Sequence, residues 1–408
     1  MKIMLINHYA GSPTMGMEYR PWYLAQEWIK TGHEVVIVAA TNAHVRNVQP
    51  EIQNTLQEEI IDGIAYLWVK TPAYNGNGLK RILNMRSFVR KLRKNASKLA
   101  QKYQPDVVIA SSTYPMDNYA AQKIARKAGA KHFYEVHDLW PLSPMELGGY
   151  KASHPFIRYL QRAEDFAYKH ADGVISMLPK TAEYMQSRGL DLRKWHYVPN
   201  GINTQEWNSF EHISSELETK IQQIRDKFQY IVGYTGSHGV SNALSTLIST
   251  AKLLRNKSIA FILIGKGPDK QNLILEAESA DLNNIFFFDP ISKQQIPHVL
   301  SFFDILYIGL QRQSLYRFGI SLNKLYDYMM AAKPVLLSIE DSDNLVNKIG
   351  CGFSVEPENP EEQAKRLESL IQMTPKQRKE MGEAGKAYVL QHHDYSVLAA
   401  QFIQILQQ

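Results

Sequence analysis

The sequence contains little cysteine and no long apolar segment, and each of these absences excludes a class of protein. Cys351 is the single cysteine among 408 residues, so the chain cannot build a disulfide framework or a cysteine-based metal site. No apolar run approaches the roughly 20 residues that a membrane-spanning helix requires. The apolar start from Met1 to Ile6 is too short for a signal peptide. We therefore expect a cytoplasmic protein, peripheral on the inner face of the cell membrane.

Several short motifs of known chemistry are also missing. The segment Gly265-Lys266-Gly267 lacks the third glycine of a dinucleotide-binding fingerprint, and the chain has no P-loop. It contains neither a Gly-x-Ser-x-Gly nucleophile elbow nor a His-Glu-x-x-His zinc helix. The sequence therefore predicts no bound cofactor and no metal.

Short β-branched runs alternate with helical stretches along the chain, and the pattern occurs twice. Strands are expected at 2–6, 34–40, 64–70, 106–110, 132–136 and 173–177, and again at 231–234, 259–264, 285–288, 305–308 and 334–338. Helical stretches lie between them, and a turn-rich break at 198–203 precedes an irregular, charged stretch. Strands without polar alternation, separated by helices, are typical of a parallel sheet covered on both faces. The pattern predicts two doubly wound α/β domains, with the ligand in the cleft along the strand ends.

Charge is distributed unevenly along the chain. The formal net charge of +6 favours an anionic partner. From Gly76 to Tyr103 there is no acidic residue, and cations such as Arg86, Arg90 and Lys94 alternate with apolar residues at helical spacing. This pattern is typical of a basic amphipathic helix on an anionic membrane surface. The alternative is the solvated face of a helix packed on the sheet. Nucleic acid is the least favoured partner, because no binding module is recognisable.

The segment 316–335 carries the sharpest functional signal. Gly319 precedes Ser321, a good N-cap, and a helix that Pro334 ends. The N–H groups and the dipole at such a helix start form an anion site. Lys324, one turn into the helix, adds a positive charge beside a leaving diphosphate. Asp327 lies one further turn along the same face, where it can accept hydrogen bonds from ribose hydroxyls. The alternative is a capped helix with a solvent-exposed lysine.

This segment resembles the donor-binding signature of the retaining glycosyltransferases of family four. Asp327 falls on the second acidic position of the signature, whereas Gly319 stands at the first, a departure from many members. A subgroup of bacterial polysaccharide and amino-sugar transferases carries a similar Gly-Ile-Ser-x-Asn-Lys form. Here it reads Gly319, Ile320, Ser321, Leu322, Asn323 and Lys324. The resemblance implies that the backbone of this loop, rather than a carboxylate, meets the donor sugar and the diphosphate.

The resemblance extends over nearly the whole chain. Asn7-His8-Tyr9 and Gly16-Met17-Glu18-Tyr19-Arg20 resemble the first strand and the glycine loop of the family. Gly16 is then expected to let the backbone approach the donor phosphates, and Arg20 to meet an anionic acceptor group. His8, Tyr9 and Trp140 are assigned to the same acceptor site. An ordinary turn and a surface charge are the alternatives for Gly16 and Arg20.

The segment Tyr134 to Pro141 follows a predicted strand, at the end where catalytic groups collect. The family has a histidine here beside the donor sugar, so the resemblance places His137 at the reaction centre. Asp138 is expected to orient His137 or a substrate hydroxyl. A satisfied core histidine is the alternative.

In the second half, the loop Gly233 to Gly239 follows a strand and precedes a helix, so that Gly236 can admit a diphosphate. Ser237 stands where many relatives carry an arginine, and Lys266 is expected to supply part of the missing charge. The alternative for Lys266 is a common strand-ending turn. Asp341-Ser342-Asp343 looks like the metal motif of the other large glycosyltransferase fold, but its place between a strand and a helix favours a capping role.

The resemblance implies the GT-B fold. Residues 1–198, joined by a C-terminal helix at about 394–408, would bind the acceptor, and residues 199–393 would bind the nucleotide-sugar. The expected reaction is retaining, metal-independent transfer of a hexosyl or N-acetylhexosaminyl group from a UDP- or GDP-linked donor. The acceptor would be a glycan or a polyprenyl-linked sugar in cell-surface polysaccharide biosynthesis. The alternatives are a nucleotide-sugar epimerase of the same architecture and a non-catalytic protein that binds sugar or lipid.

Overall fold

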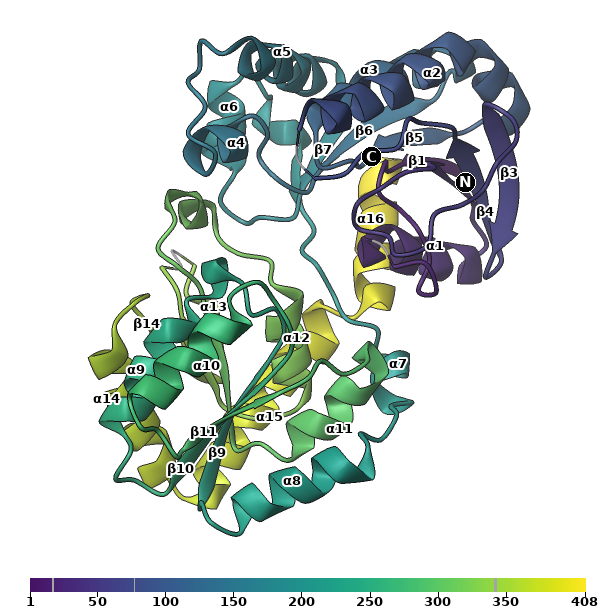
Figure 1. Ribbon diagram of the computed structural model, residues 1–408. Helices are drawn as coiled ribbons and strands as arrows, with labels where there is room; N and C mark the ends of the chain where they lie inside the picture. The colour runs from purple at the N-terminus through teal and green to yellow at the C-terminus, as the bar shows by residue number, and fades with distance from the viewer. Residues whose placement is uncertain (17, 77, 341–342) are drawn as a thin grey trace. The chain divides into compact units, whose positions relative to one another are not determined.

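The computed structural model of the chain describes residues 1–16, 18–76, 78–340 and 343–408 (Figure 1). Met17 of the glycine loop and Asp341 and Ser342 of the acidic motif lie outside the described residues. The chain forms two compact units, and each is an α/β fold of its own. Unit 1 contains Met1–Asn200 and Tyr395–Gln408, and unit 2 contains Gly201–Asp394.

Unit 1 is built on an eight-stranded sheet with the order β3-β4-β2-β1-β5-β6-β7-β8. Its strands are β1 (Lys2–Ile6), β2 (Glu34–Ala40), β3 (Leu56–Ile61), β4 (Ile64–Val69), β5 (Val107–Ala110), β6 (Lys131–Val136), β7 (Gly173–Ser176) and β8 (Trp195–Tyr197). All neighbouring strands are parallel except β3 and β4. The sequence did not predict β3 and β8, because both are edge strands without a buried apolar run.

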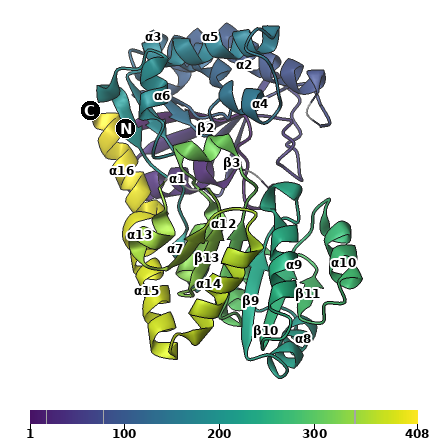
Figure 2. The same ribbon diagram turned by 90° about the vertical axis from the view of Figure 1, so that its left-hand side faces the viewer.

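Helices cover the sheet of unit 1. They are α1 (Tyr19–Lys30), α2 (Leu79–Tyr103), α3 (Asn118–Ala128), α4 (Leu142–Glu146), α5 (Pro155–His170), α6 (Ala182–Ser187) and α16 (Tyr395–Gln407), with 3-10 turns η1 (Pro115–Asp117) and η2 (Leu192–Lys194). The last helix, α16, lies beside α1 (Figure 2). Tyr23 stacks on Tyr395, and the indole N–H of Trp28 donates to the carbonyl of Ala399. The C-terminal helix therefore completes the core of unit 1.

Unit 2 is built on a six-stranded, fully parallel sheet with the order β11-β10-β9-β12-β13-β14. Its strands are β9 (Tyr230–Thr235), β10 (Ile259–Ile264), β11 (Ile285–Phe288), β12 (Ile305–Gly309), β13 (Val335–Ser338) and β14 (Gly352–Val355). In order of appearance this is the 3-2-1-4-5-6 arrangement of a dinucleotide-binding fold. β10 and β12 are buried at every residue, which explains their uninterrupted apolar sequences.

Helices also surround the sheet of unit 2. They are α7 (Thr204–Asn208), α8 (Ser215–Arg225), α9 (Leu244–Leu253), α10 (Lys270–Ser279), α11 (Ile296–Ser301), α12 (Asn323–Met330), α13 (Leu345–Ile349), α14 (Pro360–Gln372) and α15 (Pro375–His392), with 3-10 turns η3 (Val240–Asn242), η4 (Lys293–Gln295) and η5 (Ser314–Phe318). The charged stretch that the sequence predicted to be irregular contains α8. Ser214 caps this helix, and Ile221 and Ile224 bury its inner face.

The predicted fold class is confirmed in both units, since each has a mainly parallel sheet between helices. Edges of the predicted elements differ from the observed ones by one or two residues in most cases, as at β13, which begins at Val335. Within the described part of the chain, no helix combines the length and the apolar character of a membrane span.

Candidate active site

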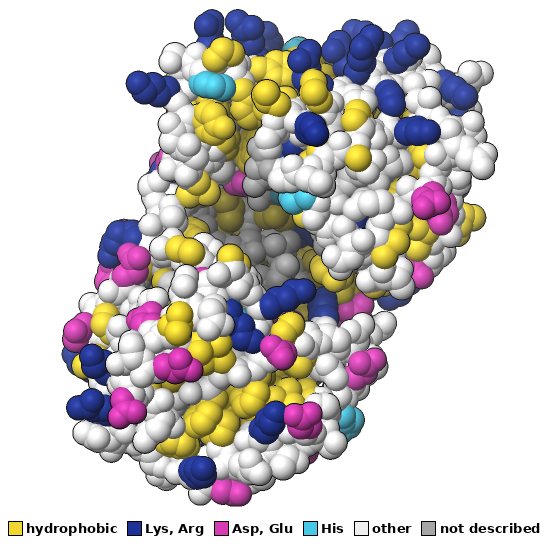
Figure 3. Space-filling view, viewed as in Figure 1, with side chains coloured by type: hydrophobic (Ala, Val, Ile, Leu, Met, Phe, Trp, Pro, Cys, Tyr) yellow, Lys and Arg dark blue, Asp and Glu magenta, His cyan; other side chains and the backbone are white. Residues whose placement is uncertain are grey.

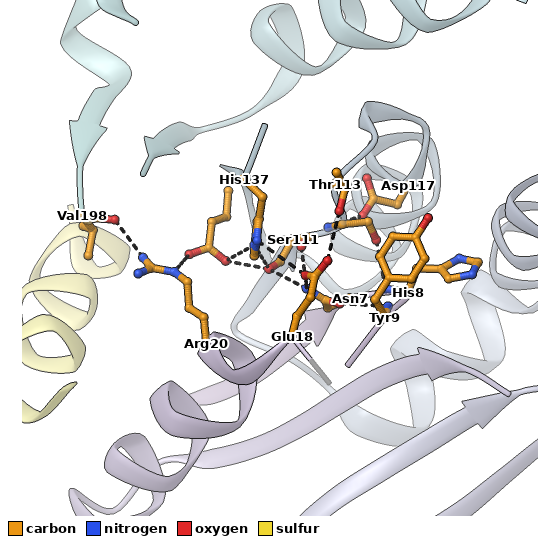
Figure 4. Close-up of polar contacts among 12 residues, drawn as sticks. Asn7, His8, Tyr9, Glu18, Arg20, Ser111, Thr113, Asp117, His137 and Val198 are labelled. Carbon is orange, nitrogen blue, oxygen red and sulfur yellow. Dashed lines mark hydrogen bonds and ion pairs between the residues drawn. The ribbon is translucent and has the colours of Figure 1, made fainter. Parts of the chain in front are cut away.

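In unit 1 the strand order reverses between β1 and β5, and sheets of this kind bind ligands beyond the carboxyl ends of the strands at that point. Asn7 follows β1, Ser111 follows β5 and His137 follows β6, so their side chains meet at one edge of the sheet (Figure 4). The amide nitrogen Nδ2 of Asn7 donates to the carbonyl of Ser111 at 2.7 Å. His137 therefore lies where the sequence predicted it, at the carboxyl end of a strand, and polar side chains from two other strand ends surround it.

His137 lies between two carboxylates (Figure 4). Its Nε2 is 3.2 Å from Oε2 of Glu135 and 2.9 Å from Oγ of Ser111. On the other side of the ring, Nδ1 is 3.6 Å from Oε2 of Glu18. The Glu18 carboxylate is fixed in turn by the hydroxyl of Thr113, which donates to Oε1 at 3.1 Å. Only 9% of the His137 side chain is exposed, so its charge state depends on these neighbours.

The two carboxylates favour the protonated form of His137. Burial lowers the pKa of this imidazole, but the hydrogen bond and charge of Glu135 and the charge of Glu18 outweigh it, and the pKa ends above its ordinary value. Burial raises the pKa of Glu135, whereas Arg20 and His137 lower it more, so the pKa of this carboxyl lies below its usual range. An imidazolium donates from both nitrogens. His137 is thus suited to bind a hydroxyl or to stabilise negative charge rather than to act as a base.

Sequence reasoning did not select Glu18 and Glu135, although both belong to motifs that it quoted. Glu135 is two residues before His137, and alternate residues of a strand share one face. Glu18 stands in the glycine loop that follows β1, and such loops meet at the carboxyl edge of a parallel sheet. A carboxylate in the glycine loop and a carboxylate two residues before the histidine were therefore the sequence features that could have predicted both neighbours of His137.

Arg20 is a structural residue in unit 1, which corrects both the expected acceptor contact and the alternative of a surface charge. Its side chain is 3% exposed. The guanidinium Nε donates to Oε1 of Glu135 at 2.7 Å, and the two terminal nitrogens donate to the carbonyls of Val198 and Pro199. All three nitrogens are engaged inside the unit, so they are not presented to an acceptor anion.

His8 and Tyr9 are also buried, in contrast to the acceptor contact expected for them. Nδ1 of His8 is 2.6 Å from the hydroxyl of Tyr114, and burial lowers the pKa of His8 to about 3, so the ring is neutral. The Tyr9 hydroxyl accepts from Nη2 of Arg81 at 3.0 Å. Burial raises the pKa of Tyr9. Tyr9 thus contacts Arg81 in the first turn of α2, and the His8 ring packs on Phe88 of the same helix, with the ring centroids 4.7 Å apart.

Asp138 and Trp140 form a short hydrogen-bonded loop after His137. The indole N–H of Trp140 donates to Oδ2 of Asp138 at 3.1 Å, and Ser143 donates to Oδ1. Asp138 therefore orients Trp140, and none of its described hydrogen bonds reaches His137. The Trp140 ring remains partly exposed beside the guanidinium of Arg81, 5.9 Å from the ring centroid.

Gly16 is in the left-handed region, with φ of 73°. A Cβ at this position would lie 3.4 Å from the carbonyl oxygen of Val45 and from the amide nitrogen of Asn47. Glycine is required here because the loop turns sharply against the segment 45–47.

In unit 2 the strand order reverses between β9 and β12, and the structure brings two predicted donor-binding residues together there. Gly236 follows β9, and Lys324 is in the first turn of α12. A Cβ on Gly236 would lie 2.8 Å from Nζ of Lys324. The same ammonium lies 4.0 Å from the centroid of the Tyr234 ring. A side chain at position 236 would therefore occupy the space beside the lysine.

The charge of Lys324 is only partly compensated by its surroundings. Burial lowers the pKa of this amine to about 7, although Asp327 opposes the shift. A cation over an aromatic face gains roughly 1 kcal/mol, less than full hydration provides. An anion bound beside Nζ would restore the charged form.

The loop around Gly236 packs closely on the loop after β10. A Cβ at Gly265 would lie 1.8 Å from the carbonyl oxygen of Gly236, so only glycine fits there. Ser237 is exposed, and its carbonyl accepts from the Tyr234 hydroxyl at 2.6 Å. Lys266 is exposed on the adjoining loop, where its carbonyl accepts from the amide of His238.

The start of α12 differs from the prediction in one respect. Leu322, not Ser321, is the N-cap residue, and the leucine side chain makes no capping hydrogen bond. Gly319 has φ of 87°, which turns the chain between η5 and the loop Ile320 to Leu322. The first N–H groups of α12 follow this turn, and N–H groups at a helix start favour an anion.

Asp327 lies one turn beyond Lys324 and lines a small cavity of about 40 Å³ with Asn203, Trp207 and Lys293. Burial raises the pKa of Asp327 to about 6, although Lys293 and Lys324 lower it. The carboxylate is thus held at the wall of a cavity rather than in the solvent. Among the residues that the structure describes, no group of three or more His, Cys, Asp or Glu is placed to hold a metal ion.

Comparison with known proteins identifies the family of the chain. The model of the glycosyl transferase 4-like domain matches residues 15–201, and the model of glycosyl transferases group 1 matches residues 216–388. Together they span most of both units. The chain belongs to the glycosyltransferases of family four.

The glycosyltransferase is similar to two bacterial proteins. It is 22% identical over 264 residues to WbjE of Pseudomonas aeruginosa, which is named as a glycosyltransferase; the match covers 64% of this chain and 63% of WbjE. It is 22% identical over 290 residues to WcaI of Escherichia coli strain K12, named as a colanic acid biosynthesis glycosyl transferase, with 68% and 69% coverage.

The fold of the glycosyltransferase is GT-B. The structure of Alr3699/HepE of Anabaena in complex with UDP-glucose aligns with a TM-score of 0.65 at 14% identity, over 99% of each chain. The predictions of family and fold are confirmed by these matches.

The basic helix α2 of the glycosyltransferase uses most of its apolar face inside unit 1, contrary to the lipid contact expected for that face. Phe88, Val89 and Leu92 are buried in the unit, whereas Leu79 and Leu83 of the first two turns are exposed. The cations Arg86, Arg90 and Lys94 are exposed as well. Figure 3 shows Lys and Arg side chains gathered along the edge of unit 1 that α2, α3 and α5 form. The exposed cations of this basic edge, rather than an apolar face of α2, are therefore the candidate contact for an anionic partner.

Proposed function

We propose that this glycosyltransferase moves a hexosyl or N-acetylhexosaminyl group from a UDP- or GDP-linked donor to a glycan or polyprenyl-linked acceptor, with retention at the anomeric carbon. The product would belong to a cell-surface polysaccharide. The name of WcaI, which refers to colanic acid biosynthesis, and the UDP-glucose complex of HepE support this assignment. The observation that carries it is the pairing of Lys324 with Gly236 at the switch point of unit 2.

Unit 2 would hold the donor. The diphosphate would lie between the first N–H groups of α12 and the ammonium of Lys324, in the space that Gly236 leaves free. Both groups stabilise the negative charge that develops on the leaving diphosphate, so we propose that the reaction requires no divalent metal. Asp327, at the wall of the neighbouring cavity, would accept hydrogen bonds from the ribose.

Unit 1 would hold the acceptor and complete the reaction centre. His137, protonated between Glu18 and Glu135, would donate a hydrogen bond to a sugar hydroxyl. Such a group orients the sugar without removing a proton. In a retaining transfer of this kind, an oxygen of the departing phosphate would take the proton of the acceptor hydroxyl.

The basic edge of unit 1 would place the enzyme on the cytoplasmic face of an anionic membrane. Each exposed Lys or Arg near such a surface contributes about 1 kcal/mol of attraction. Leu79 and Leu83, which are 78% and 57% exposed, add an apolar contact at one end of this edge.

The decisive experiment is calorimetric titration with UDP, GDP, ADP and CDP in the presence of EDTA. Wild type is expected to bind one diphosphate selectively, and Lys324→Met and Asp327→Ala to weaken it. Lys333→Met is the matched control, because burial lowers the pKa of this lysine too, but its Nζ donates to the carbonyl of Ser301.

The outcomes separate the proposal from its rivals. Binding of one diphosphate that Lys324→Met weakens and Lys333→Met leaves unchanged supports the donor site. If wild type binds none of the four, the donor assignment is wrong and a non-catalytic sugar- or lipid-binding protein takes its place. Conversion of the matching sugar nucleotide to an epimer without an acceptor would instead identify an epimerase.

A further inference from the structure

Two histidines contact each other at the surface of unit 2. His212 is in the segment between α7 and α8 and is exposed, and His298 is in α11 and is half-buried. Nδ1 of His212 lies 3.1 Å from Nε2 of His298, and the ring centroids are 4.3 Å apart. This histidine pair joins two elements that are 86 residues apart in the chain.

The hydrogen bonds of the histidine pair determine where each ring carries its proton. The backbone N–H of Ile213 donates to Nδ1 of His298 at 3.2 Å. An amide N–H can only donate, so this Nδ1 is unprotonated and the neutral ring of His298 carries its proton on Nε2. That N–H donates to Nδ1 of His212, which must be unprotonated as well. Both hydrogen bonds therefore exist together only while the two rings are neutral.

A proton added to either ring breaks one of these hydrogen bonds. On His298 it would place an N–H against the amide of Ile213, and on His212 it would place an N–H against Nε2 of His298. The stability that the pair contributes is therefore present in full above the ordinary pKa of about 6.5 and is lost as the pH falls through the pKa of the folded protein, which is lowered for His298.

The surroundings of His298 favour its neutral form on balance. Phe210 stacks on the ring, with an interplanar angle of 12° and 5.8 Å between the ring centroids. Burial lowers the pKa of this imidazole, and the charge of His212 adds to the effect, whereas the charge of Glu218 on α8 opposes it. Lys293 of η4 and Glu206 of α7, which face each other across the same contact, lie 3.8 Å apart.

The histidine pair fastens the segment 209–213 to η4 and α11. Two hydrogen bonds without a titrating group support the same contact. The N–H of Glu211 donates to the carbonyl of Gln294 at 2.9 Å, and Nε2 of Gln295 donates to the carbonyl of His212 at 2.9 Å. Because amides keep their hydrogen bonds at any moderate pH, protonation of the pair loosens the contact and leaves part of it in place.

The elements that the pair joins form the wall of the small cavity beside Asp327. Asn203 and Trp207 line this cavity from α7 and its N-cap, and Lys293 and Gln294 line it from η4. The segment that carries the first histidine continues directly from α7. Because the cavity has a volume of only about 40 Å³, a small displacement of α7 changes the space that it offers.

We propose that the histidine pair is a pH-sensitive contact that holds the wall of this cavity in place at neutral pH and releases it in mildly acidic solution. The contact itself does not depend on the function of the site. Its consequence for nucleotide binding rests on the proposed function, which gives this cavity to the ribose of the donor. His212 and His298 are then positioning residues, because they act through α7 and do not touch the ligand.

The first test measures the protection of the Ile213 amide against hydrogen exchange by NMR at pH 7.5 and pH 5.5. After correction for the intrinsic pH dependence of exchange, protection in wild type is expected to fall roughly fivefold over this range. In His298→Asn it should stay constant, because an amide oxygen can accept from the Ile213 N–H at any pH. His392→Asn, which replaces an exposed histidine of α15 in the same unit, is the matched control and should behave like wild type.

A second variant keeps the test valid if His298→Asn does not fold, as thermal melting would show. His212→Asn removes the charge that helps to lower the pKa of His298. The fall in protection of the Ile213 amide should therefore move to higher pH in this variant. A purely structural histidine would leave the pH profile in place.

The consequence for the cavity is tested by titrating UDP and GDP into wild type and His298→Asn at both pH values. Asp327, whose pKa is about 6, affects the two proteins equally. The ratio of their Kd values therefore isolates the histidine pair. Wild type is expected to lose affinity for the bound diphosphate roughly fivefold more than His298→Asn between pH 7.5 and pH 5.5.

Each other result overturns one step of the inference. If protection of the Ile213 amide is constant in wild type, or falls equally in His298→Asn, the pair is not a pH-sensitive contact. If protection falls as expected but the Kd ratio does not change, the pair opens without acting on the cavity. If wild type binds no diphosphate at pH 7.5, the proposed function has failed, and the exchange measurement still decides whether the contact responds to pH.

Discussion

Diphosphate binding to this glycosyltransferase should take up a proton above pH 7. The pKa of Lys324 is about 7 in the free protein, because burial disfavours its ammonium form. A diphosphate beside Nζ would move that pKa back toward the ordinary value of about 10.4. Between these two pKa values the free protein carries a neutral amine and the complex carries an ammonium, so binding must add one proton.

The size of the effect follows from linkage. If only the ammonium form binds the diphosphate, each pH unit above 7 reduces the population of that form about tenfold, or by about 1.4 kcal/mol. The amine is half charged at pH 7 and about one hundredth charged at pH 9, so Kd for the diphosphate should rise roughly fiftyfold between these pH values. Below pH 7 the amine is already charged and the dependence on Lys324 should disappear. The pH range avoids Asp327, whose pKa is about 6.

Calorimetry measures the proton directly. Titrations at pH 8.5 in bicine and in Tris, which differ in ionisation enthalpy, should give binding heats that differ by the difference between the two ionisation enthalpies, multiplied by nearly one proton per site. Lys324→Arg is the matched variant, since a guanidinium stays charged throughout this range. It should bind the diphosphate with little dependence on pH and without proton uptake. Equal heats in both buffers for wild type, or a flat Kd from pH 7 to 9, would refute the placement of the diphosphate at Lys324.

Three further predictions concern unit 1. Glu18→Gln should lower the pKa of His137, as NMR titration of its ring would show, because the carboxylate that raises this pKa is lost; Glu34→Gln, at the opposite end of the sheet, should leave it unchanged. Arg20→Leu should reduce the free energy of unfolding by about 3–5 kcal/mol in denaturant titration, since it leaves the Glu135 carboxylate buried and unpaired; Arg193→Gln, in an exposed pair, should leave the midpoint unchanged. Replacing Arg86, Arg90 and Lys94 with Gln should reduce flotation with vesicles containing 30% phosphatidylglycerol, and flotation that is indifferent to anionic lipid would contradict the membrane proposal. Replacing three exposed lysines of unit 2, Lys227, Lys376 and Lys379, with Gln provides the control for that loss of charge.

Most of the fold was predictable because its central strands are unambiguous in the sequence. β1, β2, β10 and β11 are observed within the residues expected for them, since each is a short apolar run between polar turns. β3 was missed because its exposed residues include Glu58 and Glu59, which carry no signal of burial. The helix α8 was missed because its charged surface hides an inner face of only two buried isoleucines.

The site was predictable where a residue's role depends on its backbone, and less so where it depends on neighbours distant in sequence. Gly236 and Lys324 are 88 residues apart, and the sequence assigned both to donor binding from the glycine loop and the helix start around them; the observed strand order places both at the switch point. Arg20 was assigned to an acceptor because the sequence does not reveal that Glu135 faces it across the core. The contact of Glu18 with His137 was not predicted for the same reason, because the two residues are distant in the sequence.

Arg20 and Lys324 show how burial separates a structural charge from a functional one. Arg20 is buried and Lys324 is half-buried, and each was expected to bind an anion. Arg20 has a carboxylate and two carbonyls for its three nitrogens, so adding a ligand would break bonds that hold unit 1 together. Lys324 lies over an aromatic ring and has a lowered pKa, so adding an anion would relieve an existing cost. The group that the fold leaves electrostatically unsatisfied is therefore the one to which a substrate can contribute stability, and in this chain it stands at the switch point of unit 2.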